Sequence, residues 1–264
     1  MIFTQNKLVM KASLRFLLLF LAAASFYACG PVLYSNVGQN VPLLQEKGEF
    51  SGQVSYSSSD GAWIANGVGL QGAYAISDKV GVISSFYSMK GAEDQGDEWE
   101  GKGSYFELGV GLFGGNPDKK ISYEGYAGVG TASIKNTSIV NSGSKLHVNY
   151  IKPFIQPSIG FTTRYFDMAL TPRISYLNIT SGDDLQLVLD GMPINSGEFL
   201  DEINHKVMFE PGILIRGGFP QAKLEIQYNI STLKEPSEEY FLLNNEFVSI
   251  GLRFLISGRF AGKE

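Results

Sequence analysis

Apolar and polar side chains alternate along most of this chain from residue 49 onward. In one clear example, the apolar Leu224, Ile226 and Tyr228 alternate with the polar Glu225 and Gln227. A period of two places successive side chains on opposite faces of a β-strand. The pattern predicts ten strands, at residues 49–58, 65–76, 79–90, 103–113, 120–135, 146–163, 165–179, 206–217, 220–231 and 243–257.

Two stretches depart from this pattern. The segment 146–163 contains Pro153 and Pro157, and its alternation changes phase near Lys152, which predicts a β-bulge in that strand. The segment 29–48 contains two prolines and several polar residues without any period. We interpret it as a periplasmic tether that leads to the first strand.

The predicted connections alternate between short and long. The short connections are 77–78, 114–119, 164 and 218–219, and the long ones are 58–64, 91–102, 136–145, 180–205 and 232–242. Membrane barrels have short periplasmic turns and longer external loops, whereas a soluble sandwich has no reason to sort its loops in this way. The fold class is therefore all-β: a single closed antiparallel transmembrane barrel of about ten strands, with eight or twelve as alternatives.

Composition agrees with this fold and excludes other classes. Glycine makes up 31 of the 264 residues, aromatic residues 12%, and charged residues only 18%, below the roughly 25% of a soluble domain. Beyond the N-terminal region, no apolar run is long enough for a membrane helix. The net charge of −5 and the lack of a basic cluster give no support to a nucleic-acid partner.

The N-terminal 28 residues have the features of an export signal. Lys7, Lys11 and Arg15 precede a short apolar run that ends in alanines, and the only cysteine of the chain, Cys29, follows. The segment 25–30 resembles a bacterial lipobox, in which the cysteine becomes the lipidated first residue of the mature protein. We therefore expect a lipoprotein signal peptide at 1–28 and an outer-membrane anchor at Cys29, with a plain secretion signal as the alternative.

Several segments resemble those of a known family. The stretch 74–82 looks like a hairpin of small outer-membrane β-barrel domains, and 42–49 and 165–170 resemble lipobox-bearing members from Bacteroidota. Near the C-terminus, Gly251, Phe254 and Ile256 are similar to the barrel-assembly signal, although a tail, 258–264, follows the barrel domain 49–257. The resemblance implies fold and location, and it implies no particular chemistry.

The polar phase of the strands carries charges of both signs. Near the bilayer midplane a lipid-facing Arg or Lys costs about 2–4 kcal/mol, so we expect these residues to face the lumen as a network of paired charges or, alternatively, to line a narrow channel. The predicted network consists of Glu107, Glu124, Asp167, Arg173, Glu210, Arg216, Lys223, Glu225 and Arg253.

The two most acidic long loops, 91–102 and 181–204, are the predicted binding surfaces. Both combine carboxylates with apolar residues of the kind that anchor interfaces, and the apolar core 185–189 of the second loop suggests a small hairpin or lid. The candidate binding residues are Trp99, Asp183, Asp184, Leu185, Leu187 and Phe199. The acidic spacing in 91–100 does not match an EF-type calcium loop, so no metal site or cofactor is predicted.

Catalytic candidates are few. The chain contains two histidines, His147 and His205, both near predicted external strand ends, and no serine in a nucleophile-elbow motif. The parity of His205 places it with the lipid-facing residues, whereas the phase change leaves the direction of His147 open. The sequence thus predicts an outer-membrane barrel lipoprotein without evident catalysis and with a structural or binding role. Its candidate partners are membrane lipid and a protein at the external loops. The alternatives are a porin-like pore, a hydrolase at the barrel rim and a soluble ligand-binding barrel lipoprotein with reversed sidedness.

Overall fold

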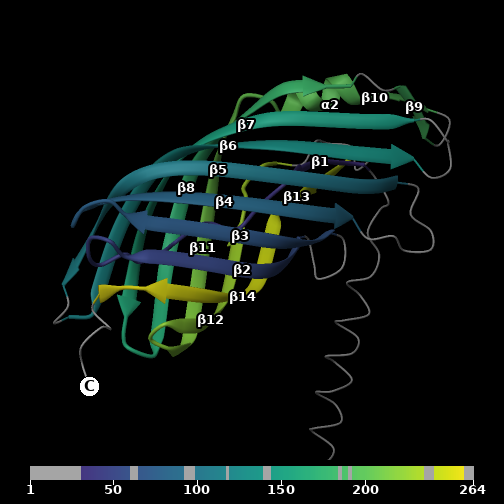
Figure 1. Cartoon of the computed structure of the whole chain (residues 1–264). Coiled ribbons are helices and arrows are strands. Elements are labelled where there is room, and N and C mark those ends of the chain that lie inside the picture. Colours follow the sequence, from purple (N-terminus) through teal and green to yellow (C-terminus); the bar gives the residue numbers. More distant parts are fainter. Residues whose placement is uncertain are drawn as a thin grey trace, which may run out of the picture.

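The computed structural model describes residues 31–59, 65–91, 99–116, 119–138, 144–183, 186–189, 192–234 and 241–258. Ten antiparallel strands form a closed barrel in the order β11-β12-β14-β2-β3-β4-β5-β6-β7-β8 (Figure 1). The strands of the barrel are β2 (Phe50–Ser59), β3 (Ala65–Ala75), β4 (Val80–Gly91), β5 (Trp99–Asn116), β6 (Ile121–Ser138), β7 (Lys145–Thr162), β8 (Phe166–Gly182), β11 (Lys206–Phe219), β12 (Ala222–Ile230) and β14 (Glu246–Ile256). The predicted fold class is confirmed, and each predicted strand corresponds to one of these.

The barrel is closed by pairing between the first and last of these strands. Strand β14 pairs with β2 from Phe247↔Ser59 to Ile256↔Phe50, so no strand edge remains unpaired. Closure satisfies the backbone hydrogen bonds that lipid cannot satisfy. Among the described residues, no helix is long and apolar enough to cross a bilayer.

The outer surface of the barrel is apolar. Large side chains of the apolar phase are half exposed, as for Leu108 (51%), Ile226 (51%) and Leu252 (50%), whereas their charged neighbours Glu107 and Glu225 are fully buried. An apolar exterior around a charged interior is the arrangement of a transmembrane barrel and the reverse of a soluble one. The alternative of a soluble ligand-binding barrel is therefore wrong.

Loop lengths distinguish the two ends of the barrel. The connections β3–β4, β5–β6, β7–β8 and β11–β12 span at most four residues. The connections at the other end are longer, and two of them, β8–β11 and β12–β14, hold further structure. Short turns mark the periplasmic end of outer-membrane barrels, so the other end is external. In Figure 1 the C-terminal end of β14 lies at the end opposite α2.

The long external connections contain additional elements. Strands β9 (Gln186–Leu189) and β10 (Met192–Asn195) form the small hairpin predicted for this loop, and α2 (Ser196–Ile203), which was not predicted, follows directly. The Asn195 side chain caps α2 by accepting a hydrogen bond from the Gly197 amide. Strand β13 (Leu242–Asn244) precedes β14 and pairs in parallel with β1 (Val32–Ser35).

Strand β7 alternates without a change of phase. Every second side chain from Leu146 to Gly160 is buried, so Lys152 faces the lumen, and the predicted phase change is wrong. The register with β8 does shift, between Asn149 and Tyr150, which is close to the predicted bulge. The misreading arose because Leu146, Val148 and Tyr150 are apolar residues that face inward.

Candidate functional site

The lumen is occupied by the N-terminal part of the chain. Residues 31–44, here called the lumen segment, are buried except for the half-buried Val32, and residues 45–49 continue to the periplasmic start of β2. The predicted periplasmic tether at 29–48 is therefore wrong for these residues, because they lie inside the barrel. The segment has no period of two because the barrel wall surrounds it on all sides.

The lumen segment descends from the external end to the periplasmic end. At its start, the Leu242 amide donates to the Pro31 carbonyl (3.0 Å), and Asn136 near the external end of β6 binds both backbone groups of Val32. Toward its end, the Leu43 amide donates to Glu124 (3.0 Å), and Gln45 Nε2 donates to Ser122 at the periplasmic start of β6 (3.4 Å). Residue 31, the first described residue, therefore lies at the external end of the lumen.

Side chains of the wall bind the backbone of the lumen segment along this path. Gln227 Nε2 donates to the Gln39 carbonyl (2.7 Å), Asn229 Nδ2 to the Val37 carbonyl (2.9 Å) and Gln156 Nε2 to the Asn40 carbonyl (2.8 Å). Further donors are Tyr150 to the Ser35 carbonyl (3.2 Å) and Arg216 Nη2 to the Val41 carbonyl. Buried backbone groups need such partners, and these hydrogen bonds fix the position of the segment.

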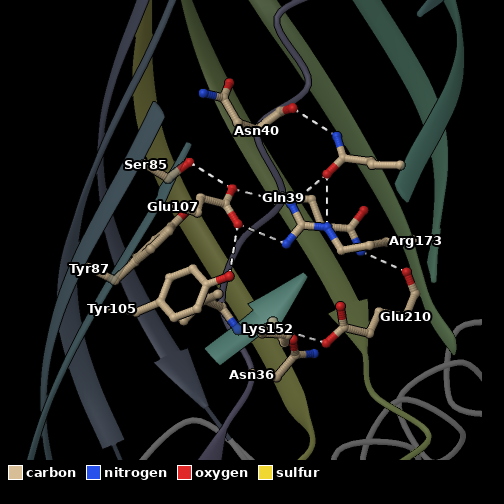
Figure 2. A network of polar contacts seen from close by, with 12 residues as sticks. Asn36, Gln39, Asn40, Ser85, Tyr87, Tyr105, Glu107, Lys152, Arg173 and Glu210 are labelled. Atoms are coloured by element: carbon tan, nitrogen blue, oxygen red, sulfur yellow. Dashed lines mark hydrogen bonds and ion pairs between the residues drawn. The ribbon is translucent and has the colours of Figure 1, made fainter. Parts of the chain in front are cut away.

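One layer of buried charges surrounds the middle of the lumen segment (Figure 2). Arg173 binds both carboxylate oxygens of Glu107 through Nη1 (3.0 Å) and Nη2 (3.3 Å), and Tyr105 and Ser85 each donate to the same carboxylate (3.0 Å). Bidentate pairing with two extra donors satisfies a carboxylate that is fully removed from water.

The second ion pair of this layer joins two wall strands, β7 and β11, and its carboxylate residue also contacts the lumen segment. Lys152 Nζ lies 2.9 Å from Glu210 Oε1, and Tyr34 of β1 donates to the same oxygen (2.8 Å). Gln39 Nε2 donates to the Glu210 backbone carbonyl (2.6 Å). A lumen-segment side chain thus donates a hydrogen bond to one oxygen of a buried carboxylate.

A second layer of charges lies nearer the periplasmic end. Glu225 accepts from Arg216 and from Arg253 (2.8 Å) through one oxygen and from Gln53 (2.6 Å) through the other. Lys223 Nζ lies 2.7 Å from Asp167 Oδ1. The paired charges in both layers can hold the wall and the lumen segment together without any ligand.

The structure places all nine residues of the predicted lumen network inside the barrel. Glu124 binds the backbone of the lumen segment at Leu43, and the other eight form the ion pairs of the two layers. Sequence reasoning missed Lys152, which is fully buried and pairs with Glu210. The charge of Lys152 was itself the available signal, because a lysine that faces lipid near the bilayer midplane is destabilising and a lysine in a strand is therefore expected to face the lumen.

The external half of the lumen is apolar. Leu33, Tyr34 and Val37 of the lumen segment pack in one buried cluster with wall residues such as Leu146 and Val148. Leu200 and Ile203 of α2 and Phe241 before β13 belong to the same cluster, so α2 and β13 close the lumen over the segment. At the periplasmic end, a cavity of about 690 Å³ lies below Pro42 and Leu43.

The predicted binding residues of the external loops differ in their exposure in the structure. Trp99 and Phe199 are each only 9% exposed, and Phe199 packs against Phe241 with ring centroids 4.5 Å apart. The expectation that these two rings offer exposed anchors is therefore wrong: they belong to the core. Asp183 is half exposed, whereas Asp184, Leu185 and the side chain of Leu187 lie outside the described residues.

The two histidines lie apart at the external rim. His147 Nδ1 is 3.0 Å from Asp183 Oδ2, with side chains that are 40% and 50% exposed, and the ring lies on the outer phase of β7. His205 Nδ1 is 2.8 Å from the Tyr176 hydroxyl. Among the described residues, no group of three potential metal ligands occurs. Cys29 lies outside the described residues, and Gly251, Phe254 and Ile256 lie in β14.

Comparison with known proteins gives structural neighbours only. No family model matches the sequence, and no curated protein matches it. Ail of Yersinia pestis is 14% identical, covering 80% of this chain and 99% of its own, with a TM-score of 0.36. OprG of Pseudomonas aeruginosa is 12% identical (82% and 99% covered, TM-score 0.37), and the Escherichia coli outer-membrane protease OmpT is 11% identical (79% and 94% covered, TM-score 0.38). OprG and OmpT are outer-membrane proteins, and at these identities the likeness of all three concerns the barrel architecture alone.

Proposed function

We propose that this protein is a self-plugged outer-membrane barrel lipoprotein without catalytic activity, which acts through the structures it displays at the external rim. The observation that carries the proposal is the lumen segment, which fills the barrel from the external rim down to the cavity at the periplasmic end. A lumen filled by a hydrogen-bonded segment has no continuous path for solutes. This favours a structural or binding role over a porin-like channel.

The path of the lumen segment also bears on the lipid anchor. Pro31 is held at the external end, and Cys29 precedes it by two residues, a reach of about 7 Å. A diacylglycerol group on Cys29 would therefore enter the outer leaflet rather than the inner one. The anchor and the barrel would together fix the mature N-terminus at the cell surface.

The closed lumen is tested by planar-bilayer recording. The intact protein should give no stable conductance, whereas a variant that lacks residues 31–44 should open a pore, provided that heat-modifiable gel migration shows a folded barrel. Gly38→Leu is a second way to displace the segment, because a Cβ at Gly38 would lie 2.3 Å from the Tyr87 hydroxyl and 2.9 Å from Phe247. A large conductance from the intact protein would instead support the porin-like alternative.

The anchor is tested separately. Cys29→Ser should abolish labelling by a radioactive fatty acid, and continued labelling would reject lipidation at this residue. An epitope inserted between Gly30 and Pro31 should be accessible to antibody on intact cells. The same epitope inserted in the turn at Ser77 and Asp78 should be accessible only after the outer membrane is permeabilised, and the opposite result would reject the proposed direction of the segment.

The binding role is assigned to the external loops 91–102 and 181–204. Deletion of 185–197 removes the β9–β10 hairpin without touching any barrel strand, so the barrel should still fold and migrate in a heat-modifiable way. Chemical crosslinking on intact cells should then lose the adducts formed by the parent protein. Unchanged crosslinks would place the binding surface elsewhere.

A hydrolase at the barrel rim is a second candidate because His147 and Asp183 form a couple at the external end. In the described part of the chain, however, Asp183 is the only hydrogen-bond partner recorded for the His147 ring, and the nearby Ser181 hydroxyl accepts from Asn149 instead. A base that activates a nucleophile needs a hydroxyl or thiol within reach. Turnover of fluorogenic peptide or ester substrates that is lost in His147→Ala would support this candidate over the non-catalytic proposal.

A further inference from the structure

The cavity at the periplasmic end of the lumen has the size and the lining of a small-molecule site. Its volume of about 690 Å³ lies within the range of about 300–1,000 Å³ that is typical of such sites. Tyr165, Pro220 and Leu255 give it apolar surface. Hydroxyl and amide side chains, which both donate and accept hydrogen bonds, line it together with charged ones. These hydroxyl and amide residues are Gln45, Asn116, Ser122, Thr162, Thr163 and Gln221.

Two side chains of this cavity present a hydrogen-bond donor beside an acceptor. Arg216 of β11 and Asp167 of β8 are directly opposite each other, are 2% and 5% exposed, and both line the cavity. Arg216 Nη1 and Asp167 Oδ2 are 4.0 Å apart, which is too far for a hydrogen bond. Within the described part of the chain, the side-chain hydrogen bonds of Arg216 use Nε and Nη2, and that of Asp167 uses Oδ1. Arg216 Nη1 and Asp167 Oδ2 are therefore available to a ligand.

Contacts behind this donor–acceptor pair hold both side chains in place. Arg216 donates through Nε to Glu225 and through Nη2 to the Val41 carbonyl of the lumen segment. Lys223 Nζ donates to Asp167 Oδ1 at 2.7 Å. Groups that are fixed before a ligand arrives lose little conformational freedom when it binds, so the pair is preorganised for binding.

The donor–acceptor pair favours an uncharged ligand. An anion at Arg216 Nη1 would be repelled by Asp167, and a cation at Asp167 Oδ2 would be repelled by Arg216. Neighbouring acetamido and hydroxyl groups of a sugar can accept from the guanidinium and donate to the carboxylate at the same time. Residues 117–118 and 259–264, which follow Asn116 and Gly258, lie outside the described residues, and the binding of an uncharged ligand does not depend on their charges.

We propose that the cavity binds the end of an uncharged N-acetylhexosamine chain, the chemistry of the cell-wall glycan on the periplasmic side. An acetamido carbonyl would accept from Arg216 Nη1, the adjacent hydroxyl would donate to Asp167 Oδ2, and the apolar face of the sugar ring would pack against Tyr165. The proposal depends on which end of the barrel is periplasmic, and it does not rest on the role proposed for the external rim.

The test is isothermal titration calorimetry of the folded protein with N,N′-diacetylchitobiose, in a detergent that contains no sugar. Asp167→Asn keeps an oxygen for Lys223 and replaces the free acceptor by an amide donor. It should weaken binding about 10-fold or more, as expected for the loss of a hydrogen bond to a charged group. The control Asp78→Asn makes the same change in the exposed turn between β3 and β4 and should bind as the parent does. Heat-modifiable migration shows that the variants are folded.

A second variant tests the cavity without changing any charge. Thr162→Phe places a ring in the cavity, leaves Arg216 and Asp167 intact, and should also weaken binding of the disaccharide. Cellobiose, which has the hydroxyls but no acetamido group, should bind more weakly than N,N′-diacetylchitobiose. The proposal would be overturned if the parent did not bind N,N′-diacetylchitobiose, if Asp167→Asn or Thr162→Phe bound it as the parent does, or if cellobiose bound equally well. Displacement of the disaccharide by inorganic phosphate would also overturn it, because the cavity would then bind anions in general.

Discussion

The ion pair between Glu107 and Arg173 gives the sharpest test of the filled lumen. Both side chains are fully buried, and Arg173 binds the two carboxylate oxygens at 3.0 and 3.3 Å. Arg173→Met would leave the carboxylate with only the Tyr105 and Ser85 hydroxyls as donors, and Glu107→Gln would leave the guanidinium with Gln156 as its side-chain partner. Removing one partner of a buried pair costs about 3–5 kcal/mol.

The double variant Glu107→Gln/Arg173→Met should cost no more than either single change. In the double variant no buried charge of this pair remains, so most of the penalty in each single variant disappears, and the coupling energy is about 3 kcal/mol. The measurement is urea-induced unfolding of the protein in phospholipid vesicles, followed by tryptophan fluorescence and by heat-modifiable migration. Additive effects of the two changes would refute the reasoning, because they would mean that the charges do not depend on each other.

A control for this cycle lies on the same strand. Lys102 and Glu100 form an ion pair at 2.5 Å, with side chains that are 55% and 28% exposed. Exposed pairs contribute about 0–1 kcal/mol because water screens them. The corresponding glutamine variants should therefore change the unfolding free energy by less than about 1 kcal/mol, which would show that burial, and not charge removal alone, sets the cost at Glu107.

Two further predictions concern the barrel exterior and the lumen segment. Leu108→Arg should cost about 2–4 kcal/mol of folding free energy because it places a charge in the apolar belt of the barrel exterior. Ser104→Arg, nearer the rim on the same face of β5, should cost about 0–1 kcal/mol. Equal urea midpoints for the two variants would contradict this assignment of the lipid-facing side. Gly38→Ala should destabilise the protein by about 1–3 kcal/mol because the new Cβ would meet Tyr87, Gln227 and Phe247. Gly72→Ala should be tolerated, because nothing lies within 4 Å of a Cβ at that position. A Gly38→Ala variant with unchanged thermal unfolding would show that the lumen is not tightly filled there.

The barrel itself was predictable from the sequence because its signals are local. A period of two and the length of each connection depend only on neighbouring residues, and both are preserved in the structure from β2 to β14. The position of the lumen segment depends instead on contacts with residues more than 100 positions away, such as Tyr34 with Glu210 and Gln39 with Gln227. Such contacts leave no pattern in the segment itself.

The errors on β7 and in the external loops have the same cause, because the sequence does not show that the lumen segment lies inside the barrel. Leu146 and Val148 are apolar although they face inward, because they pack against the lumen segment, so their side of the strand resembled a lipid-facing one. Trp99 and Phe199 resembled exposed anchors because the loops around them are acidic, but the filled lumen offers them an apolar core. Once the lumen segment is known, these residues follow the ordinary rule that apolar side chains are buried.

The lumen segment also constrains how the barrel is assembled. It precedes β2 directly, and β2 closes the barrel by pairing with β14 along ten residue pairs. Threading residues 31–44 through a closed wall would require their side chains to pass Arg173, Glu107 and Lys152, which contact one another or the segment across the lumen. Placement of the segment before the seam between β2 and β14 closes would avoid this passage. Its hydrogen bonds to β7, β11 and β12 would then hold the N-terminal chain close to strands that are far away in the sequence, which lowers the entropic cost of joining the two ends of the sheet.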